Sequence, residues 1–232
     1  MNTKLADITV ILDRSGSMQS CKTDVDGGLK AFIKAQQDAS KVDGCERRFT
    51  LVQFDDRYET VCSNVKIEDA PEFKLQPRGS TALLDAVGNT INAIGIRLSA
   101  INENDRPGLV TVVIVTDGEE NSSKEFKLDQ IKKMTELQRN TYSWEFIFLG
   151  ANQDAFAEAS KLGISGAMAS NFTGAASGNA FASASNLNTR CYSAKLSGST
   201  ETQTFLSEER MAMVDPTLKV KIQPTIPTTP TV

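Results

Sequence analysis

The chain has 232 residues, of which 40% are hydrophobic and 23% are charged, proportions typical of a folded globular protein. Its 25 basic and 29 acidic residues give a formal net charge of −4. This leaves no basic excess that could follow a phosphate backbone, so nucleic acid is not expected as a partner. The sequence contains no histidine, which excludes imidazole-based catalytic triads and histidine-ligated zinc sites.

The cysteines and the apolar runs indicate where the protein resides. The four cysteines are far apart and form no CxxC pair, so we expect free thiols. A strand-like run begins within seven residues of Met1, which leaves no room for a signal peptide. No apolar run approaches the length of a transmembrane helix. We therefore expect a soluble, cytoplasmic protein that makes no membrane contact.

Hydrophobic patterning predicts alternating strands and helices over most of the chain. The predicted strands are 7–12, 49–54, 58–62, 109–115 and 144–149, and the predicted helices are 25–39, 81–98, 127–139 and 154–162. The short polar link between the second and third strands predicts an antiparallel hairpin at a sheet edge. The alternation of the remaining elements predicts a doubly wound, mostly parallel sheet in an α/β fold, with helices on both faces.

The composition changes after residue 164. Of the 36 residues in 165–200, 27 are Ala, Ser, Gly, Asn or Thr, a bias compatible with a linker. Ala180, Ala184, Leu187 and Cys191 nevertheless fall on one helical stripe, so a thin, closely packed helix is equally compatible. We expect a domain over residues 1–200, with its core at 7–165 and a small-residue-rich helical extension at 166–200.

A C-terminal extension, residues 201–232, ends in a Pro/Thr-rich tail at 222–232. The tail has an extended or polyproline character. It carries too few apolar side chains to order by itself, so we expect it to be disordered in an isolated monomer. The alternative is that it lies extended on another subunit or partner, with Ile222, Ile226 and Val232 as anchors.

Oxygen-bearing side chains follow two of the predicted strands. Asp13, Ser15 and Ser17 follow the first strand, Asp117 follows the most apolar strand, and Thr81 stands at the start of the long helix. Ligands of doubly wound sheets bind at the carboxyl ends of the strands. Hard oxygen donors suit Mg²⁺, Mn²⁺ or Ca²⁺, and this set leaves an octahedral position open to an incoming ligand. A DxSxS pattern alone is also compatible with backbone turning and helix capping.

Three segments together resemble a known site. DRSGSM at 13–18, GSTAL at 79–83 and VTDGE at 115–119 resemble, in order and spacing, the metal-ion-dependent adhesion site (MIDAS) of von Willebrand factor type A (vWA) domains. The resemblance covers residue 7 to about 165 and is similar in style to short vWA proteins of bacteria and their phages. It implies a Rossmann-like sheet that holds Mg²⁺ or a similar ion, directly or through water, at Asp13, Ser15, Ser17, Thr81 and Asp117.

In the vWA family an Asp or Glu of a protein partner completes the metal coordination. The resemblance therefore implies a non-catalytic, divalent-metal-dependent protein-binding module. An alternative is a structural component of an intracellular or phage complex that assembles through its C-terminal extension. A Mg²⁺-dependent phosphotransferase is disfavoured because Ser15 stands where that chemistry wants a second acid, and no GxGxxG loop supports a dinucleotide enzyme.

Residues around these segments have local interpretations. Glu119 and Glu120 are expected in a solvated loop. Asp85 follows Thr81 by one helical turn, and it either supports the site through a contact with a ligand residue or lies on the helix surface. Asn152 or Asp154 is expected to cap the helix that follows.

Overall fold

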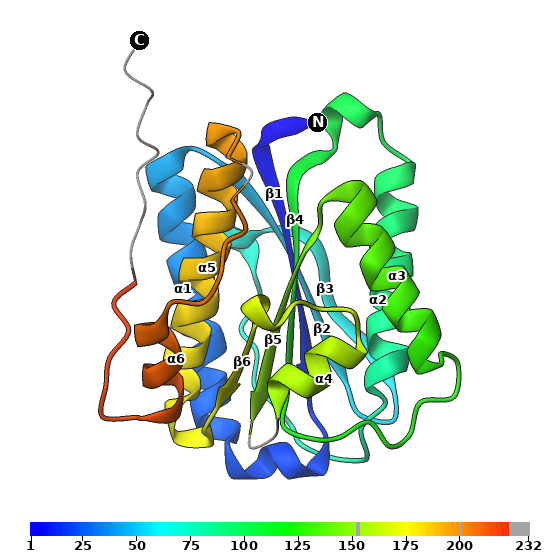
Figure 1. Cartoon of the computed structure of the whole chain (residues 1–232), viewed down its shortest axis with the longest axis vertical. Helices are drawn as coiled ribbons and strands as arrows, with labels where there is room; N and C mark the ends of the chain where they lie inside the picture. The colour runs from blue at the N-terminus through cyan, green and yellow to red at the C-terminus, as the bar shows by residue number, and fades with distance from the viewer. Residues whose placement is uncertain (152–153, 200, 223–232) are drawn as a thin grey trace.

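A computed structural model of the chain describes residues 1–151, 154–199 and 201–222. A central sheet of six strands, in the order β3-β2-β1-β4-β5-β6, lies between two layers of helices (Figure 1). The strands are β1 (Asn2–Asp13), β2 (Glu46–Phe54), β3 (Tyr58–Lys66), β4 (Pro107–Thr116), β5 (Glu145–Ala151) and β6 (Ala169–Phe172). The β2–β3 pair is antiparallel and the other pairs are parallel. The predicted doubly wound α/β sheet with an edge hairpin is confirmed.

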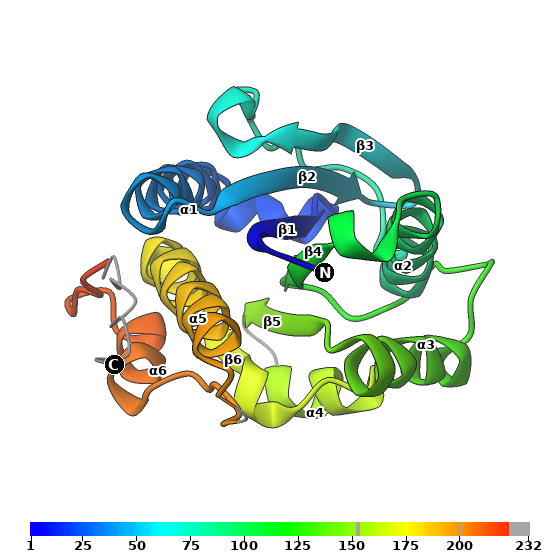
Figure 2. The same cartoon turned by 90° about the horizontal axis from the view of Figure 1, so that it is seen from above.

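Helices cover both faces of this sheet. They are α1 (Lys22–Asp43), α2 (Leu83–Ser99), α3 (Leu128–Tyr142), α4 (Ala155–Lys161), α5 (Ser177–Ser197) and α6 (Ser207–Val214). Seen from above, α1 and α5 lie side by side on one face, and α2 and α3 lie on the other (Figure 2). The shorter helices α4 and α6 both contact the edge strand β6.

The core lies along β1 and β4. β4 is buried over nearly its whole length, and β1 is buried from Ala6 to Asp13, because helices cover both faces of these strands. Continuous apolar runs such as LVTVVIV are typical of strands in this position. This run lies in β4, so the predicted central strand is confirmed. The first strand, β1, begins at Asn2, five residues before its predicted start.

The small-residue segment is not a linker. It contains two short 3-10 helices, Gly166–Met168 and Gly174–Ala176, the strand β6 and the 21-residue helix α5, and of these the sequence predicted only α5. Ala180, Ala184, Leu187 and Cys191 are all buried, as the stripe predicted. The ring of Phe181 lies so close to Gly28 of α1 that any side chain at Gly28 would overlap it.

Buried polar side chains fix how α1 and α5 meet. Gln36 of α1 donates to Ser185 Oγ (2.8 Å) and accepts from Asn188 Nδ2 (2.9 Å), both on α5. Arg47 of β2 donates to the same Gln36 oxygen (3.1 Å). A sliding of either helix would leave these buried groups unpaired, so the network sets the register of the two helices.

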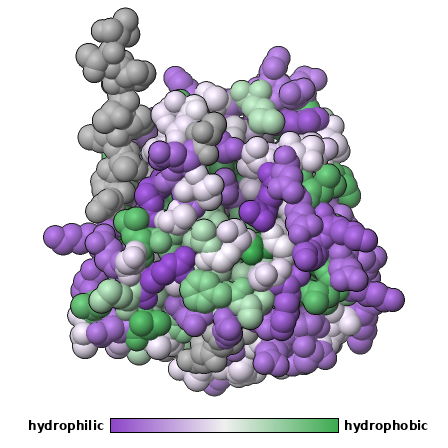
Figure 3. Space-filling model, in the orientation of Figure 1, coloured by the Kyte–Doolittle hydropathy of each residue, from purple (hydrophilic) through white to green (hydrophobic). Residues whose placement is uncertain are grey.

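The chain returns along α5 after α6. Asn179 of α5 donates to the carbonyl oxygens of Ala212 (2.8 Å) and Leu218 (3.0 Å), and Asn186 donates to that of Lys221 (3.0 Å). Apolar surface gathers over α6 on the face in Figure 3, where the side chains of Met211 and Val214 are exposed.

The remaining expectations from the sequence concern the C-terminal tail, the cysteines and membrane-spanning helices. Ile222 is 44% exposed, and the other two expected anchors of the tail, Ile226 and Val232, lie outside the described residues. All four cysteines are free thiols, as expected. Of the helices in the described part of the chain, none has the length and apolar character needed to cross a membrane.

Candidate metal centre

The candidate metal centre lies where the winding of the sheet reverses. From β1 the chain winds outward through β2 and β3 on one side, and β4, β5 and β6 follow on the other. The loops after β1 and β4 leave the sheet on opposite sides of this switch point, at the lower edge of the molecule in Figure 1. Such a switch point is the usual ligand-binding position in doubly wound sheets. Asp13 ends β1, and Asp117 directly follows β4.

Two serines of the first loop meet the aspartate of the second. Ser17 Oγ donates to Asp117 Oδ1 at 2.6 Å, although the two residues are 100 positions apart. Ser15 Oγ lies 3.0 Å from Ser17 Oγ. Ser15 is buried, whereas Ser17 is exposed and Asp117 is partly exposed. The loops thus form a cluster of oxygen atoms that is open to solvent on one side.

Asp13 lies beneath this cluster and is completely buried. One carboxylate oxygen accepts the backbone N–H of Ser15 (2.6 Å), and the other accepts from Thr116 Oγ1 (2.6 Å). Burial raises the pKa of Asp13 to about 6 despite these hydrogen bonds, and burial also raises the pKa of Asp117. The charged forms of both carboxylates are therefore poorly solvated, a condition that a bound cation offsets.

Thr81 joins the cluster from the loop before α2. A methyl group built on Gly118 would lie 3.0 Å from Thr81 Oγ1, 3.6 Å from Ser17 Oγ and 3.8 Å from Ser15 Oγ. The three hydroxyls therefore converge on one small space above Gly118. Thr81 precedes the first residue of α2 by two positions, so it is a loop residue and does not begin the helix as predicted.

The donor set fits a hard divalent cation. The structure brings together two carboxylates and three hydroxyls, the residues singled out from the sequence, and we call them the edge cluster: Asp13, Ser15, Ser17, Thr81 and Asp117. All the donors are oxygens, as Mg²⁺, Mn²⁺ and Ca²⁺ prefer. Nowhere in the described part of the chain do three acidic or cysteine side chains gather into a possible metal site, so hydroxyl oxygens would have to complete the ligand set of the edge cluster.

The loop after β4 is fastened to the loop that carries Thr81. The backbone N–H of Thr81 donates to Asn121 Oδ1 (2.9 Å), and the N–H of Asn121 donates to the Thr81 carbonyl (3.0 Å). Glu120 accepts from the backbone N–H of Leu84 (2.9 Å) and from both the N–H and the Oγ of Ser123 (each 2.7 Å). The expectation that Glu120 is merely solvated is therefore wrong, because it orders this loop.

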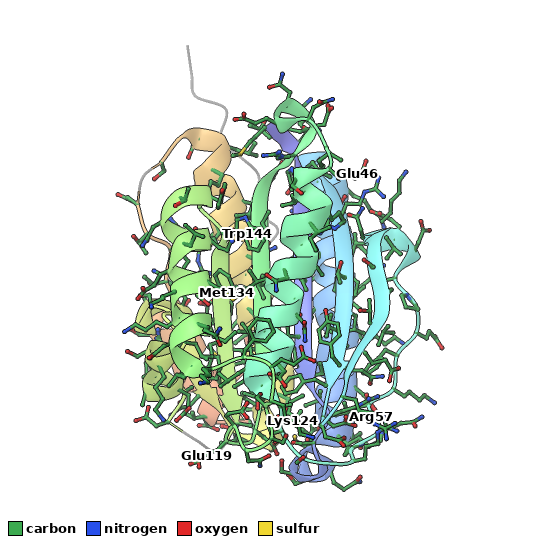
Figure 4. All side chains as sticks on the ribbon, turned by 90° about the vertical axis from the view of Figure 1, so that its right-hand side faces the viewer. Glu46, Arg57, Glu119, Lys124, Met134 and Trp144 are labelled. Carbon is green, nitrogen blue, oxygen red and sulfur yellow. The ribbon has the colours of Figure 1, made fainter. Side chains whose placement is uncertain are left out.

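Asp85 orders the end of the same loop, and none of its hydrogen bonds goes to a residue of the edge cluster. Its carboxylate accepts three consecutive backbone N–H groups, from Lys124 (2.7 Å), Glu125 (2.9 Å) and Phe126 (2.9 Å). Glu119 is exposed, as predicted, and lies with Lys124 and Arg57 at the edge of the molecule that carries the cluster (Figure 4). The surface around the cluster therefore carries charges of both signs.

Asp154 caps α4 by accepting the N–H of Ala157 (3.1 Å), and the other expected cap, Asn152, lies outside the described residues.

Sequence reasoning missed a group of buried charges beside the cluster. Arg14, inside the DRSGSM segment, is 4% exposed and pairs with the fully buried Asp55, which also pairs with Arg78. The sequence signal for this pair was Arg14 itself, a charged residue that directly follows a strand predicted to be buried.

Comparisons with known proteins identify the fold. No protein-family model matches the chain, and no curated protein matches it either. Among solved structures, proximal thread matrix protein 1 (PTMP1) from the mussel byssus, in its second crystal form, is 18% identical with a TM-score of 0.57. The match covers 79% of this chain and 48% of that chain, so this chain spans less than half the length of PTMP1.

The vWF domain of the type V pili tip protein Mfa5 from Porphyromonas gingivalis is also similar, with 12% identity and a TM-score of 0.52. That match covers 86% of this chain and 97% of the Mfa5 domain. The α/β fold of this chain is therefore the Rossmann-like fold of vWA domains, as the sequence resemblance implied. At these identities the comparisons establish the fold alone.

Proposed function

We propose that this chain is a non-catalytic protein-binding module whose edge cluster holds a divalent metal ion, with Mg²⁺ as the principal candidate. The observation that carries the proposal is the convergence of three hydroxyls and two carboxylates at the switch point of the sheet. Ser15, Ser17, Thr81, Asp13 and Asp117 would hold the ion, directly or through water. The bound ion would supply a positive centre with a coordination position for an acidic side chain of a protein partner.

The chain's own residues suit binding better than turnover. The site contains no histidine, and both oxygens of Asp13 are engaged by the N–H of Ser15 and the hydroxyl of Thr116. Asp13 is thereby held as a support and is not presented as a nucleophile. PTMP1, Mfa5 and the pilus adhesin SpaC from Lactobacillus rhamnosus GG, which has a TM-score of 0.50, are matrix, pilus-tip and adhesin proteins by their names, which agrees with a binding role.

Calorimetric titration with Mg²⁺ and Mn²⁺ tests the metal site. We expect Asp117→Ala to abolish binding, because it removes both a charge and an oxygen donor from a hard-ion site. Glu119→Ala is the matched control: it removes an exposed carboxylate two residues away, and solvent screening should limit its effect on affinity to about threefold. Equal metal affinity in wild type and Asp117→Ala would refute the assignment.

The open coordination position can be tested with propionate, which has the chemistry of a glutamate side chain. Water-proton relaxation reports the exchangeable water on protein-bound Mn²⁺. We expect propionate to reduce this relaxation in the wild type by displacing water. Relaxation that stays constant up to high propionate concentration would argue against a carboxylate-binding function while leaving metal binding intact.

A further inference from the structure

A groove of about 760 Å³ runs between helix α1 and the segment 67–75, which follows β3. This segment lies beside α1 (Figure 2). No residue of the edge cluster lines the groove. Its volume is within the range of about 300–1,000 Å³ that is typical of ligand-binding pockets. The groove is therefore a second candidate binding site, separate from the candidate metal centre.

The two walls of the groove are attached to each other at both ends. Gln37 Nε2 on α1 donates to the carbonyl of Ile67 (2.9 Å), and the backbone N–H of Leu75 donates to Asp26 Oδ1 (2.6 Å). The eleven positions between Asp26 and Gln37 on α1 correspond to about 16 Å along the helix axis. These two hydrogen bonds therefore set the length of the groove, which suits a short peptide segment.

The floor of the groove is apolar. Leu29 is buried, whereas Ile33, Ala70 and Phe73 pack on the core and remain partly exposed. On the α1 side, a methyl group built on Gly27 would meet nothing within 4 Å. Apolar side chains of a ligand that lay between the two walls would remove this surface from water.

The wall opposite α1 offers unpaired backbone groups. In the described part of the chain, the N–H and C=O groups of Glu72, Phe73 and Lys74 have no hydrogen-bond partner. These residues belong to no helix or strand, and both Glu72 and Lys74 are exposed. Free backbone donors and acceptors beside an apolar groove are the features with which proteins bind an added peptide strand.

The rim of the groove is positively charged, although the whole chain has a net charge of −4. Lys30 and Lys74 are exposed and form no ion pair within the described residues. Of the two acids among the described lining residues, Asp26 pairs with Lys22 at 2.8 Å, and only Glu72 is uncompensated. Complementary charges at a rim favour and orient an oppositely charged partner, so the two lysines favour an acidic ligand.

We propose that this groove binds a segment of a protein partner in which apolar residues alternate with Asp or Glu. The backbone of the segment pairs with residues 72–74. Because side chains alternate along a strand, its apolar side chains face Ile33 and Phe73 while its acids lie near Lys30 and Lys74. The proposal goes beyond the proposed metal-dependent function and does not rest on it.

The chain's own Pro/Thr-rich tail is a poor occupant of this groove. Its prolines, Pro224, Pro227 and Pro230, have no N–H with which to pair with residues 72–74. The charged residues that precede the tail are Lys219 and Lys221, which would add like charge to the basic rim. The groove therefore suits a partner's acidic segment better than this tail.

The probe for the test is a phage-displayed library of random short peptides, selected on the wild-type protein in EDTA so that no divalent metal takes part. We expect the enriched peptides to alternate apolar and acidic residues. One of them, made with a fluorescent label, is then titrated by fluorescence polarisation. We expect Gly27→Leu, which fills the groove, to weaken its binding at least about tenfold.

Gly95→Leu is the matched control for the groove variant. Gly95 lies in α2, on the opposite face of the sheet, and a methyl group built there also meets nothing within 4 Å. This variant adds the same apolar side chain to a helix but leaves the groove open. Its affinity for the peptide should equal that of the wild type.

The charged rim and the backbone pairing have readouts of their own. The double variant Lys30→Glu, Lys74→Glu changes only exposed side chains and should weaken peptide binding about tenfold. The control is Lys132→Glu, Lys133→Glu on α3, where the lysines are also exposed, and it should bind normally. Bound peptide should slow hydrogen exchange at the amides of residues 72–74.

The outcomes that would overturn the proposal are distinct. No enrichment above a selection without protein, enriched peptides that lack acids, or equal binding by wild type and Gly27→Leu would each refute an acidic-peptide groove. Unchanged exchange at residues 72–74 would refute the backbone pairing. A wild-type dimer in analytical ultracentrifugation that Gly27→Leu abolishes would identify a second copy of the chain as the occupant instead. None of these results bears on the metal site.

Discussion

Gly118 shows how closely the edge cluster depends on a single missing side chain. A methyl group there would enter the space where Thr81, Ser17 and Ser15 direct their hydroxyls, with Thr81 Oγ1 only 3.0 Å away. Overpacking of this kind costs about 1–3 kcal/mol. We therefore expect Gly118→Ala to weaken Mn²⁺ binding about 10- to 100-fold, measured by calorimetry.

Gly16→Ala is the control for this prediction. A methyl group at Gly16, in the loop of the same cluster, would meet only the Gly79 carbonyl oxygen at 3.6 Å, an ordinary van der Waals contact. Its metal affinity should stay close to that of the wild type. If the two variants bind Mn²⁺ equally well, the ion does not occupy the space above Gly118.

The residues of the edge cluster were predictable from the sequence, and the buried ion pair between Arg14 and Asp55 was not. Asp13, Ser15 and Ser17 lie within five positions, and strands that end at one sheet edge bring Asp117 to them. The pairing of Arg14 with Asp55 spans 41 positions and depends on how the β2–β3 turn folds back. No local pattern encodes such a contact, because acidic residues in a short turn usually face solvent.

At the scale of elements, two neighbouring glycines of α1 allow the contribution of the α1–α5 contact to stability to be predicted. A side chain at Gly28 would overlap the ring of Phe181 on α5, whereas one at Gly27 would meet nothing within 4 Å. We expect Gly28→Ala to destabilise the protein by about 1–3 kcal/mol. Gly27→Ala should stabilise it by about 0.5–1 kcal/mol, because alanine is the better helix former.

Urea unfolding of both variants measures these free energies. Because the substitutions are chemically identical and adjacent, effects of opposite sign would isolate the helix–helix contact. Equal stabilisation by both would mean that Phe181 does not pack on Gly28 in solution.

The strands and helices predicted from the sequence are those whose apolar residues form a continuous run or recur at regular spacing. The run in β4 and the stripe of α5 are examples, since burial on both faces or on one stripe leaves a pattern in the sequence. β6 has four residues, ASNF, and its pairing with β5 comes from tertiary contacts. Helix α6 is only eight residues long and is fixed in place by Arg190, which pairs with Glu209 at 2.8 Å, so its local signal is weak.

For the whole molecule, metal binding should be linked to thermal stability. An ion that binds only the folded protein adds about 2.7 kcal/mol at a concentration 100 times its Kd. For a domain of this size, that corresponds to a rise in Tm of about 5–10 °C. Differential scanning calorimetry in Mg²⁺ and in EDTA should show this rise in the wild type and none in Asp117→Ala. A rise of equal size in both would indicate that Mg²⁺ acts elsewhere on the surface.

The central position of β1 also has a consequence for how the chain folds during its synthesis. β1 can pair with β2 early, but its other edge waits for β4, and the contact of Asp13 with Thr116 spans 103 positions. At about 5–20 residues per second, a ribosome needs roughly 5–20 s to cover that interval. Tyr192 then closes the structure by donating to the carbonyl of Thr3 (2.9 Å), 189 positions earlier. Until β4 has been synthesised, one edge of β1 is unpaired, so the nascent chain depends on slow, non-local pairing and is open to aggregation before the fold closes.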